Sequence, residues 1–251
     1  MSSSIWTRCA GDSELRELRL SPWRVVESQH QVSTRKLVDS ADEQALLEQL
    51  IDGAKPPDHT GGRLHYLLFT PFRYPPLPFG SRFGRRHERG IWYGSLERRT
   101  AFAEVAYYRL LFIEGTHAEL GTITTPLTAF RAALRTTRGV ALDAPPFDAF
   151  RAVIASPSRY DDTQALGDAM RAADVDAFTY PSARDNEGGV NVAAFVPSVF
   201  GRAKPTSLES WYCSASRERV DITRGDYFRR ETFSFAREQF LVDGILPAPA
   251  V

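Results

Sequence analysis

The stretch that decides the fold is Thr100-Ala-Phe-Ala-Glu-Val-Ala-Tyr-Tyr-Arg-Leu-Leu-Phe-Ile113. Thr100 can cap a helix, and Gly115 follows the last apolar residue closely enough to end it. Nearly every position between them is apolar or aromatic, and no side of the helix is clearly polar. A helix that is apolar nearly all round is buried. We therefore expect a helix over 100–113 inside the core of the fold.

Glu104 is the single acidic residue of this apolar stretch. Helical spacing puts it on one face with Ala101, Tyr108 and Leu111. A buried carboxylate is costly without a partner, and we expect an arginine of the preceding loop to pair with it. Two interpretations fit this pattern: a structural ion pair, or a carboxylate that binds a ligand.

The loop before the helix, from Pro71 to Arg89, is rich in proline, glycine and arginine. Glycines let backbone N–H groups approach a ligand closely, and arginine forks match phosphate oxygens. A solvated surface loop is the alternative that composition leaves open. Seven arginines lie between residues 71 and 99, and one more follows in the helix: Arg73, Arg82, Arg85, Arg86, Arg89, Arg98, Arg99 and Arg109.

A second polar stretch, Thr179-Tyr-Pro-Ser-Ala-Arg-Asp-Asn-Glu-Gly-Gly-Val-Asn191, joins two expected strands. Ser182 and Asn191 are the residues that can contact a ligand there. The same residues, together with the paired glycines, also suit a turn that binds nothing.

The remaining elements are short. We expect a helix at 40–52, capped by Ser40 and Glu43, and another to about residue 173, capped by Asp161 or Asp162. Apolar runs predict strands at 64–70, 90–94, 118–124, 127–135, 175–180, 190–196, 207–214 and 226–235. Because strands outnumber helices and do not alternate with them, the sequence indicates an α+β fold rather than a doubly wound parallel sheet.

Composition excludes several classes of protein. The 251 residues carry equal numbers of acidic and basic side chains, which disfavours a general polyanion binder, so we expect no direct nucleic-acid partner. No apolar run approaches the roughly 18 residues of a membrane span, and the first residues lack the apolar core of a signal peptide. The five histidines are dispersed and only two cysteines are present, so we expect neither a metal site nor a disulfide framework. These features indicate a cytoplasmic protein with no membrane partner.

Taken together, the motifs resemble the RES-domain toxins, a bacterial family named for its Arg, Glu and Ser. The family pattern has a G-G-R-W/F segment, a tyrosine about ten residues later, a T-A-x-x-E helix start and a later serine. The corresponding segments here are Gly80-Ser-Arg-Phe-Gly84, Trp92-Tyr93, Thr100-Ala-Phe-Ala-Glu104 and Tyr180-Pro-Ser182, with Asn191 beyond. The resemblance spans about 64–200, and the extra N-terminal residues resemble the longer, ParT-like members.

The resemblance implies an ADP-ribosyltransferase-like α+β fold, with a mixed β core, flanking helices and an N-terminal helical extension. Residues 1–60 are then an extension packed on the core, and 61–251 are the domain. The helix at 40–52, flanked by Trp6 and Trp23, suits a helical layer, and Pro56–Gly62 suits a linker or long loop.

The resemblance also implies a function. A toxin of this kind would consume NAD as its substrate, need no metal, and be neutralised by a cognate helix-turn-helix antitoxin protein. It would cleave the nicotinamide–ribose bond and transfer ADP-ribose to a protein target. Within the same class the alternative is an NAD glycohydrolase or phosphorylase. A noncatalytic nucleotide- or protein-binding module is the alternative of another class.

Four residues carry over from the family as the catalytic set: Arg82, Tyr93, Glu104 and Ser182. In this assignment Arg82, Tyr93 and Ser182 also bind NAD, and Arg73 and Asn191 are further contacts. Arg82 would neutralise the pyrophosphate, and Glu104 would stabilise positive charge on the ribose. Ser81 replaces the second glycine of the family motif, and Tyr93 lies 11 residues after Arg82, so Trp92 is the other candidate for the family tyrosine.

Overall fold

The computed structural model describes residues 4–28, 40, 42–43, 46–47, 50, 62–74, 80–224 and 231–248. The helices are α1 (Ile5–Arg8), α3 (Tyr66–Arg73), α4 (Arg98–Glu114), α5 (Arg151–Ile154) and α6 (Asp161–Ala172), with short 3-10 turns at Gly11–Glu14, Phe147–Phe150, Pro197–Val199 and Arg237–Phe240. The strands are β1 (Arg16–Leu20), β2 (Trp23–Glu27), β3 (Trp92–Ser95), β4 (Ile123–Arg131), β5 (Leu134–Ala141), β6 (Ala177–Pro181), β7 (Val190–Ala194), β8 (Ser207–Ala215), β9 (Arg219–Arg224) and β10 (Thr232–Ala236).

These strands form one sheet in the order β1-β5-β6-β7-β3-β2-β4-β8-β9-β10. Neighbouring strands are antiparallel except β5 and β6, which run parallel. The sheet is therefore mixed, and the α+β class predicted from the sequence is confirmed.

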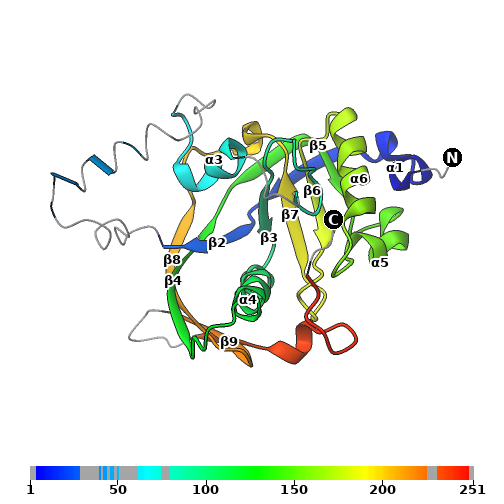
Figure 1. The fold of residues 1–251 in the computed structure, drawn as a ribbon. Coiled ribbons are helices and arrows are strands. Elements are labelled where there is room, and N and C mark those ends of the chain that lie inside the picture. The colour runs from blue at the N-terminus through cyan, green and yellow to red at the C-terminus, as the bar shows by residue number, and fades with distance from the viewer. Residues whose placement is uncertain are drawn as a thin grey trace.

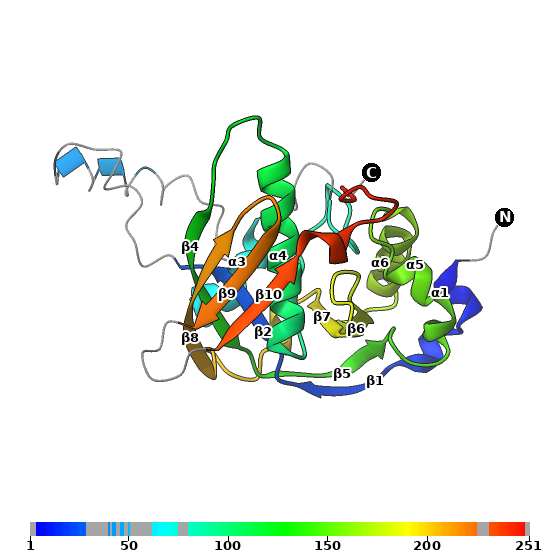
Figure 2. The same cartoon turned by 90° about the horizontal axis from the view of Figure 1, so that it is seen from below.

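Helix α4 is the central helix of the fold. Figure 1 views it almost end-on, with β4 and β9 curving round it, and Figure 2 shows it lying along β9 and β10. Its buried residues Phe102, Ala106 and Leu110 belong to a core cluster with Trp211 of β8 and Val220 of β9. The predicted helix is confirmed, and it begins two residues earlier than Thr100. It is not buried all round, because Tyr108 and Phe112 are 52% and 61% exposed. No helix among the described residues is long and apolar enough to cross a membrane.

The two faces of the sheet carry different clusters. Trp92 and Tyr93 are neighbours on β3, so their side chains point to opposite faces. Trp92 packs with Leu68 of α3 and Phe130 of β4 on one face. Tyr93 points to the other face, where α6 contributes Met170 to a cluster over β5, β6 and β7. Helix α4 covers the same face as Tyr93 further along, and it contacts β3 and β7.

Several predicted elements are confirmed within a few residues, namely β3, β6, β7, β8 and α6. The strand predicted at 64–70 is wrong, because these residues form helix α3; a short apolar run does not distinguish a buried strand from a buried helix. The strands predicted at 118–124 and 127–135 correspond largely to one strand, β4. Helix α6 follows Tyr160, and neither Asp161 nor Asp162 caps it.

The N-terminal region departs from the predicted helical layer. Residues 16–27 form β1 and β2, and β2 pairs with both β3 and β4 inside the sheet. The positions described between 42 and 50 are helical, and Ser40 Oγ accepts the predicted capping bond from the Glu43 N–H at 3.1 Å. Leu46 and Leu50 are exposed there. The expected linker before Gly62, and residues 226–230 of the last predicted strand, lie outside the described residues.

Candidate functional site

Glu104 is held by two side chains from the second polar stretch. Ser182 Oγ donates to Glu104 Oε1 at 2.8 Å, and Asn191 Nδ2 donates to the same oxygen at 2.6 Å. Among the described residues, Oε2 of Glu104 has no hydrogen-bond donor. The arginine partner predicted for Glu104 is therefore wrong, because two neutral donors hold the carboxylate and leave one of its oxygens free for a ligand.

Ser182 is fully used by the protein itself. Its hydroxyl accepts from the backbone N–H groups of Arg184 and Asp185, both at 3.1 Å. A hydroxyl has one proton and two lone pairs, and the proton goes to Glu104. Ser182 thus closes a turn and also orients the Glu104 carboxylate. The stretch therefore both forms a turn and contributes to the candidate site.

Asn191 is oriented by a neighbouring strand. Ser95 Oγ donates to Asn191 Oδ1 at 2.7 Å, which turns the amide N–H₂ toward Glu104. Ser95 and Asn191 lie opposite each other on β3 and β7, and Tyr180 lies opposite Asn191 on β6. Three adjacent strands therefore present Ser95, Asn191 and Tyr180 in one row beneath α4.

Arg82 sits in a tight turn between Gly80 and Gly84. Gly80 has φ +75°, and a side chain there would meet the Gly84 carbonyl oxygen at 2.5 Å, so the turn requires glycine. Arg82 is 9% exposed, its guanidinium lies 4.6 Å from the Tyr160 ring centre, and Nη1 donates to the carbonyls of Ile154 and Ser156 at 3.1 and 2.7 Å. These bonds use one of its nitrogens.

Tyr93, and not Trp92, faces this side of the sheet. Tyr93 Oη shares a hydrogen bond with Ser81 Oγ at 2.9 Å and accepts from the Phe83 N–H at 3.3 Å. Burial raises the pKa of Tyr93 to about 12. The phenol is therefore neutral near neutral pH, and it fixes the turn that carries Arg82.

Arg184 is a residue that the sequence reasoning missed. It is 3% exposed, its guanidinium lies 3.4 Å from the Tyr107 ring centre, and Nη2 donates to the Pro157 carbonyl at 2.7 Å. The charges of Arg82, Arg184 and Glu104 all act on the Tyr107 hydroxyl, whose pKa burial raises to about 12. The feature of the sequence that could have identified Arg184 is its position two residues after Ser182, within the polar stretch 179–191.

The other arginines of the loop do not join this group. Arg73 lies in the last turn of α3, on the opposite face of the sheet from Glu104. Carboxylates elsewhere pair with four of them: Arg85 with Asp168, Arg98 with Glu209 and Glu231, Arg99 with Glu187, and Arg109 with Glu27. Arg86 and Arg89 are exposed. Of the arginine-rich loop, only Arg82 belongs to the site around Glu104.

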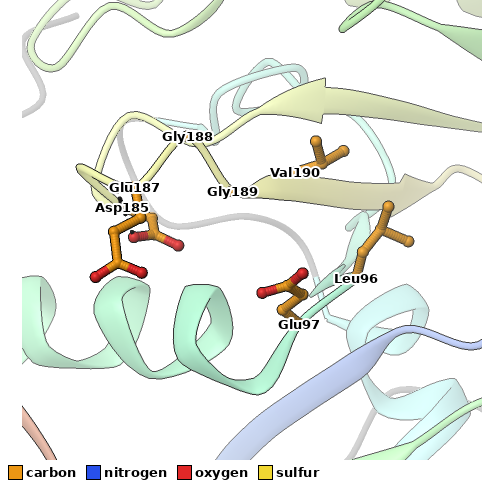
Figure 3. A pocket seen from close by; sticks show the side chains of 7 residues that line it. All are labelled: Leu96, Glu97, Asp185, Glu187, Gly188, Gly189 and Val190. Atoms are coloured by element: carbon orange, nitrogen blue, oxygen red, sulfur yellow. Dashed lines mark hydrogen bonds between the residues drawn. The ribbon is translucent and has the colours of Figure 1, made fainter.

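A hollow with acidic walls borders the site. Figure 3 shows Glu97 at the start of α4 and Asp185 and Glu187 on the loop between β6 and β7, above that helix. Its other lining residues are Leu96, Gly188, Gly189 and Val190. Arg99 bonds with Glu187 at 2.7 Å, and Thr100 Oγ1 donates to Asp185 at 2.8 Å. Three carboxylates against one arginine make this hollow unsuited to a phosphate.

The arrangement thus has a cationic side and an anionic side. Arg82 and Arg184 lie beside aromatic rings, and Glu104 presents a carboxylate oxygen without a donor. Such a pairing suits a ligand that carries negative charge at one end and develops positive charge at the other. Within the described ranges, no group of three or more His, Cys, Asp and Glu side chains could hold a metal ion.

Comparison with known protein families gives one finding. The family model described as the RES domain matches residues 56–218, which is more than half of the chain. The matched range contains Arg82, Tyr93, Glu104 and Ser182. No curated protein matches the sequence.

Proposed function

This chain belongs to the RES domain family, and from the site around Glu104 we propose that it cleaves the nicotinamide–ribose bond of NAD. The ADP-ribose then passes to an acceptor, for which we favour a protein. We further propose that the chain is the toxin of a toxin–antitoxin system and that a helix-turn-helix antitoxin neutralises it.

The observation that carries the proposal is the geometry of Glu104. Ser182 and Asn191 bind only Oε1, so the carboxylate is fixed in direction while Oε2 is open to a ligand. A carboxylate that is fixed in direction stabilises a sugar that develops positive charge, and it needs no reorganisation as the reaction proceeds.

The chemistry follows from these groups. The bond between ribose C1′ and the nicotinamide nitrogen breaks, and its electron pair leaves with neutral nicotinamide. Positive charge spreads over C1′ and the ring oxygen, next to Glu104. An acceptor oxygen or nitrogen then bonds to C1′ and loses its proton. Arg82 binds the pyrophosphate through the guanidinium edge that the carbonyls of Ile154 and Ser156 leave free.

Purified protein incubated with NAD labelled in the adenylate half, with and without cell lysate, tests this function. We expect nicotinamide release and a discrete labelled protein band in the lysate. A phosphate-dependent small product would instead identify a phosphorylase, and free ADP-ribose a glycohydrolase. If NAD stays intact in every condition, also after any copurified antitoxin is removed, the cleavage proposal is wrong and a noncatalytic binding module takes its place.

A further inference from the structure

We propose that Arg184 is the second cation of this site and that, with Arg82, it binds the diphosphate of a dinucleotide or of ADP-ribose. The identification of the ligand rests on the proposed function. The burial of Arg184 without an acidic partner by itself favours an anion at this place, whichever reaction follows.

Arg184 is a buried charge without an acidic partner. Its side chain is 3% exposed, yet in the part of the chain that the structure describes it forms no ion pair with a carboxylate. Burying a charge is costly unless an opposite charge or several hydrogen bonds compensate. A guanidinium has five N–H donors. Among the described residues, the Pro157 carbonyl is the single hydrogen-bond acceptor for those of Arg184. The described residues therefore leave the positive charge of Arg184 without a counter-charge.

Arg82 is also a buried cation without an acidic partner among the described residues, and it lies close to Arg184. It is 9% exposed, and carbonyl oxygens are its hydrogen-bond acceptors among the described residues. Arg82 binds the Ser156 carbonyl and Arg184 binds the next one, that of Pro157, each at 2.7 Å. Because adjacent Cα atoms are about 3.8 Å apart, bonds to two successive carbonyls keep the guanidinium groups within about 10 Å of each other.

Both guanidinium groups keep donors available. Arg184 lies against the Tyr107 ring and Arg82 against the Tyr160 ring, and these contacts fix each planar fork. None of the remaining N–H groups of either arginine is a buried donor without a partner. Because these groups also have no described acceptor, their protons remain for a ligand oxygen to accept.

The charge count favours a diphosphate. Arg82 and Arg184 carry two positive charges that pair with no described carboxylate, and the diphosphate of a dinucleotide carries one negative charge on each phosphorus. Each arginine can then bind one phosphate through a planar fork. The backbone N–H of Arg184 donates to Ser182 Oγ, which in turn donates to Glu104. The turn that places Arg184 therefore also fixes the distance between the diphosphate and the carboxylate.

Titration calorimetry with inorganic diphosphate, ADP-ribose and adenosine tests the proposal on the wild type, Arg184→Lys, Arg184→Gln and Arg135→Gln. Arg135 is an exposed arginine of β5 and serves as the matched control. We expect both Arg184 variants to bind ADP-ribose and diphosphate about ten- to a hundredfold more weakly. Adenosine binding and the control variant should be unchanged.

Two results would overturn the proposal. If the Arg184 variants fold and bind ADP-ribose as tightly as the wild type does, Arg184 has a purely structural role. The same conclusion follows if the variants lose as much affinity for adenosine as for ADP-ribose. If neither variant folds, side-chain Nε–H NMR of the wild type decides, because diphosphate must shift the Arg184 signal and an unmoved signal contradicts the proposal. If ADP-ribose binding depends on Arg184 while NAD is never cleaved, the anion site stands and the proposed reaction fails.

Discussion

The Ser182 hydroxyl donates its only proton to Oε1 of Glu104, at 2.8 Å, while it accepts from two backbone N–H groups. It therefore has no donor left for a ligand. In the proposed reaction, Ser182 acts through Glu104, by holding the carboxylate in one direction. This makes it a positioning residue.

Ser182→Ala should lower kcat about tenfold or more and leave KM for NAD near its wild-type value. The variant loses a bond that orients Glu104 and leaves two backbone donors without an acceptor, at a cost of about 1–3 kcal/mol in the free energy of unfolding. Steady-state kinetics and urea unfolding measure both effects, with Ser210→Ala on the exposed face of β8 as control. A raised KM at unchanged kcat would mean that Ser182 contacts the ligand directly.

Gly167→Ala should destabilise the protein and abolish NAD cleavage together. A Cβ at Gly167 of α6 would lie 2.0 Å from the carbonyl oxygen of Phe83, so the turn carrying Arg82 must move. Overpacking of this kind costs about 1–3 kcal/mol or more. At Gly115 the nearest atom would be 3.4 Å away, so Gly115→Ala is the matched control. Equal melting temperatures for the two variants would contradict the role of Gly167.

The pH dependence of stability should change in Tyr93→Phe. Burial raises the pKa of Tyr93 to about 12, against about 10 in the unfolded chain, so the folded protein holds the phenol proton more tightly. This contribution, about 2–3 kcal/mol, is complete below pH 10 and is lost between pH 10 and 12. The free energy of unfolding, measured with urea across that pH range, should fall less steeply for Tyr93→Phe than for the wild type. Parallel curves would contradict the assignment, and Tyr212→Phe, at a 52% exposed tyrosine, is the control.

Arg82→Lys should weaken NAD binding about tenfold, although the charge is kept. Lysine lacks the planar fork that binds two phosphate oxygens at once. An ammonium that donates to the carbonyls of Ile154 and Ser156 keeps a single N–H for a phosphate. Titration with NAD at fixed ionic strength measures the loss. Arg85→Lys, in the same loop but exposed and paired with Asp168, should bind NAD as the wild type does. Unchanged affinity in Arg82→Lys would move the anion contact elsewhere.

The sequence predicts those parts of the fold that depend on local pattern. The apolar run around Glu104 indicates a helix packed in the core, and the structure buries most of it while leaving Tyr108 and Phe112 exposed. Helix α3 is missed because the run from Leu64 to Thr70 is too short for its periodicity to separate helix from strand. Strands β1 and β2 are missed because they are stabilised by pairing with strands far along the chain, which no local pattern records.

For the site, too, local sequence features could be predicted and long-range contacts could not. The residues Arg82, Tyr93, Glu104, Ser182 and Asn191 could be chosen from their types and spacing. Their partners could not, because Glu104 and Ser182 are 78 positions apart and only the folded sheet brings them together. Local charge suggested an arginine beside Glu104, whereas the fold places neutral donors there. Arg184 becomes a candidate for anion binding only once the structure shows that it is buried without an acidic partner among the described residues.

Nicotinamide release by Glu104→Gln, measured beside thermal unfolding, tests the central claim most directly. Glutamine keeps the shape of the side chain and removes its charge, so the rate should fall about 10²–10³-fold while the melting temperature stays close to that of the wild type. Glu97→Gln is the matched control: it removes an exposed carboxylate from the start of the same helix and should keep the wild-type rate. A folded Glu104→Gln protein that releases nicotinamide at the wild-type rate would contradict the claim that this carboxylate drives the cleavage of NAD.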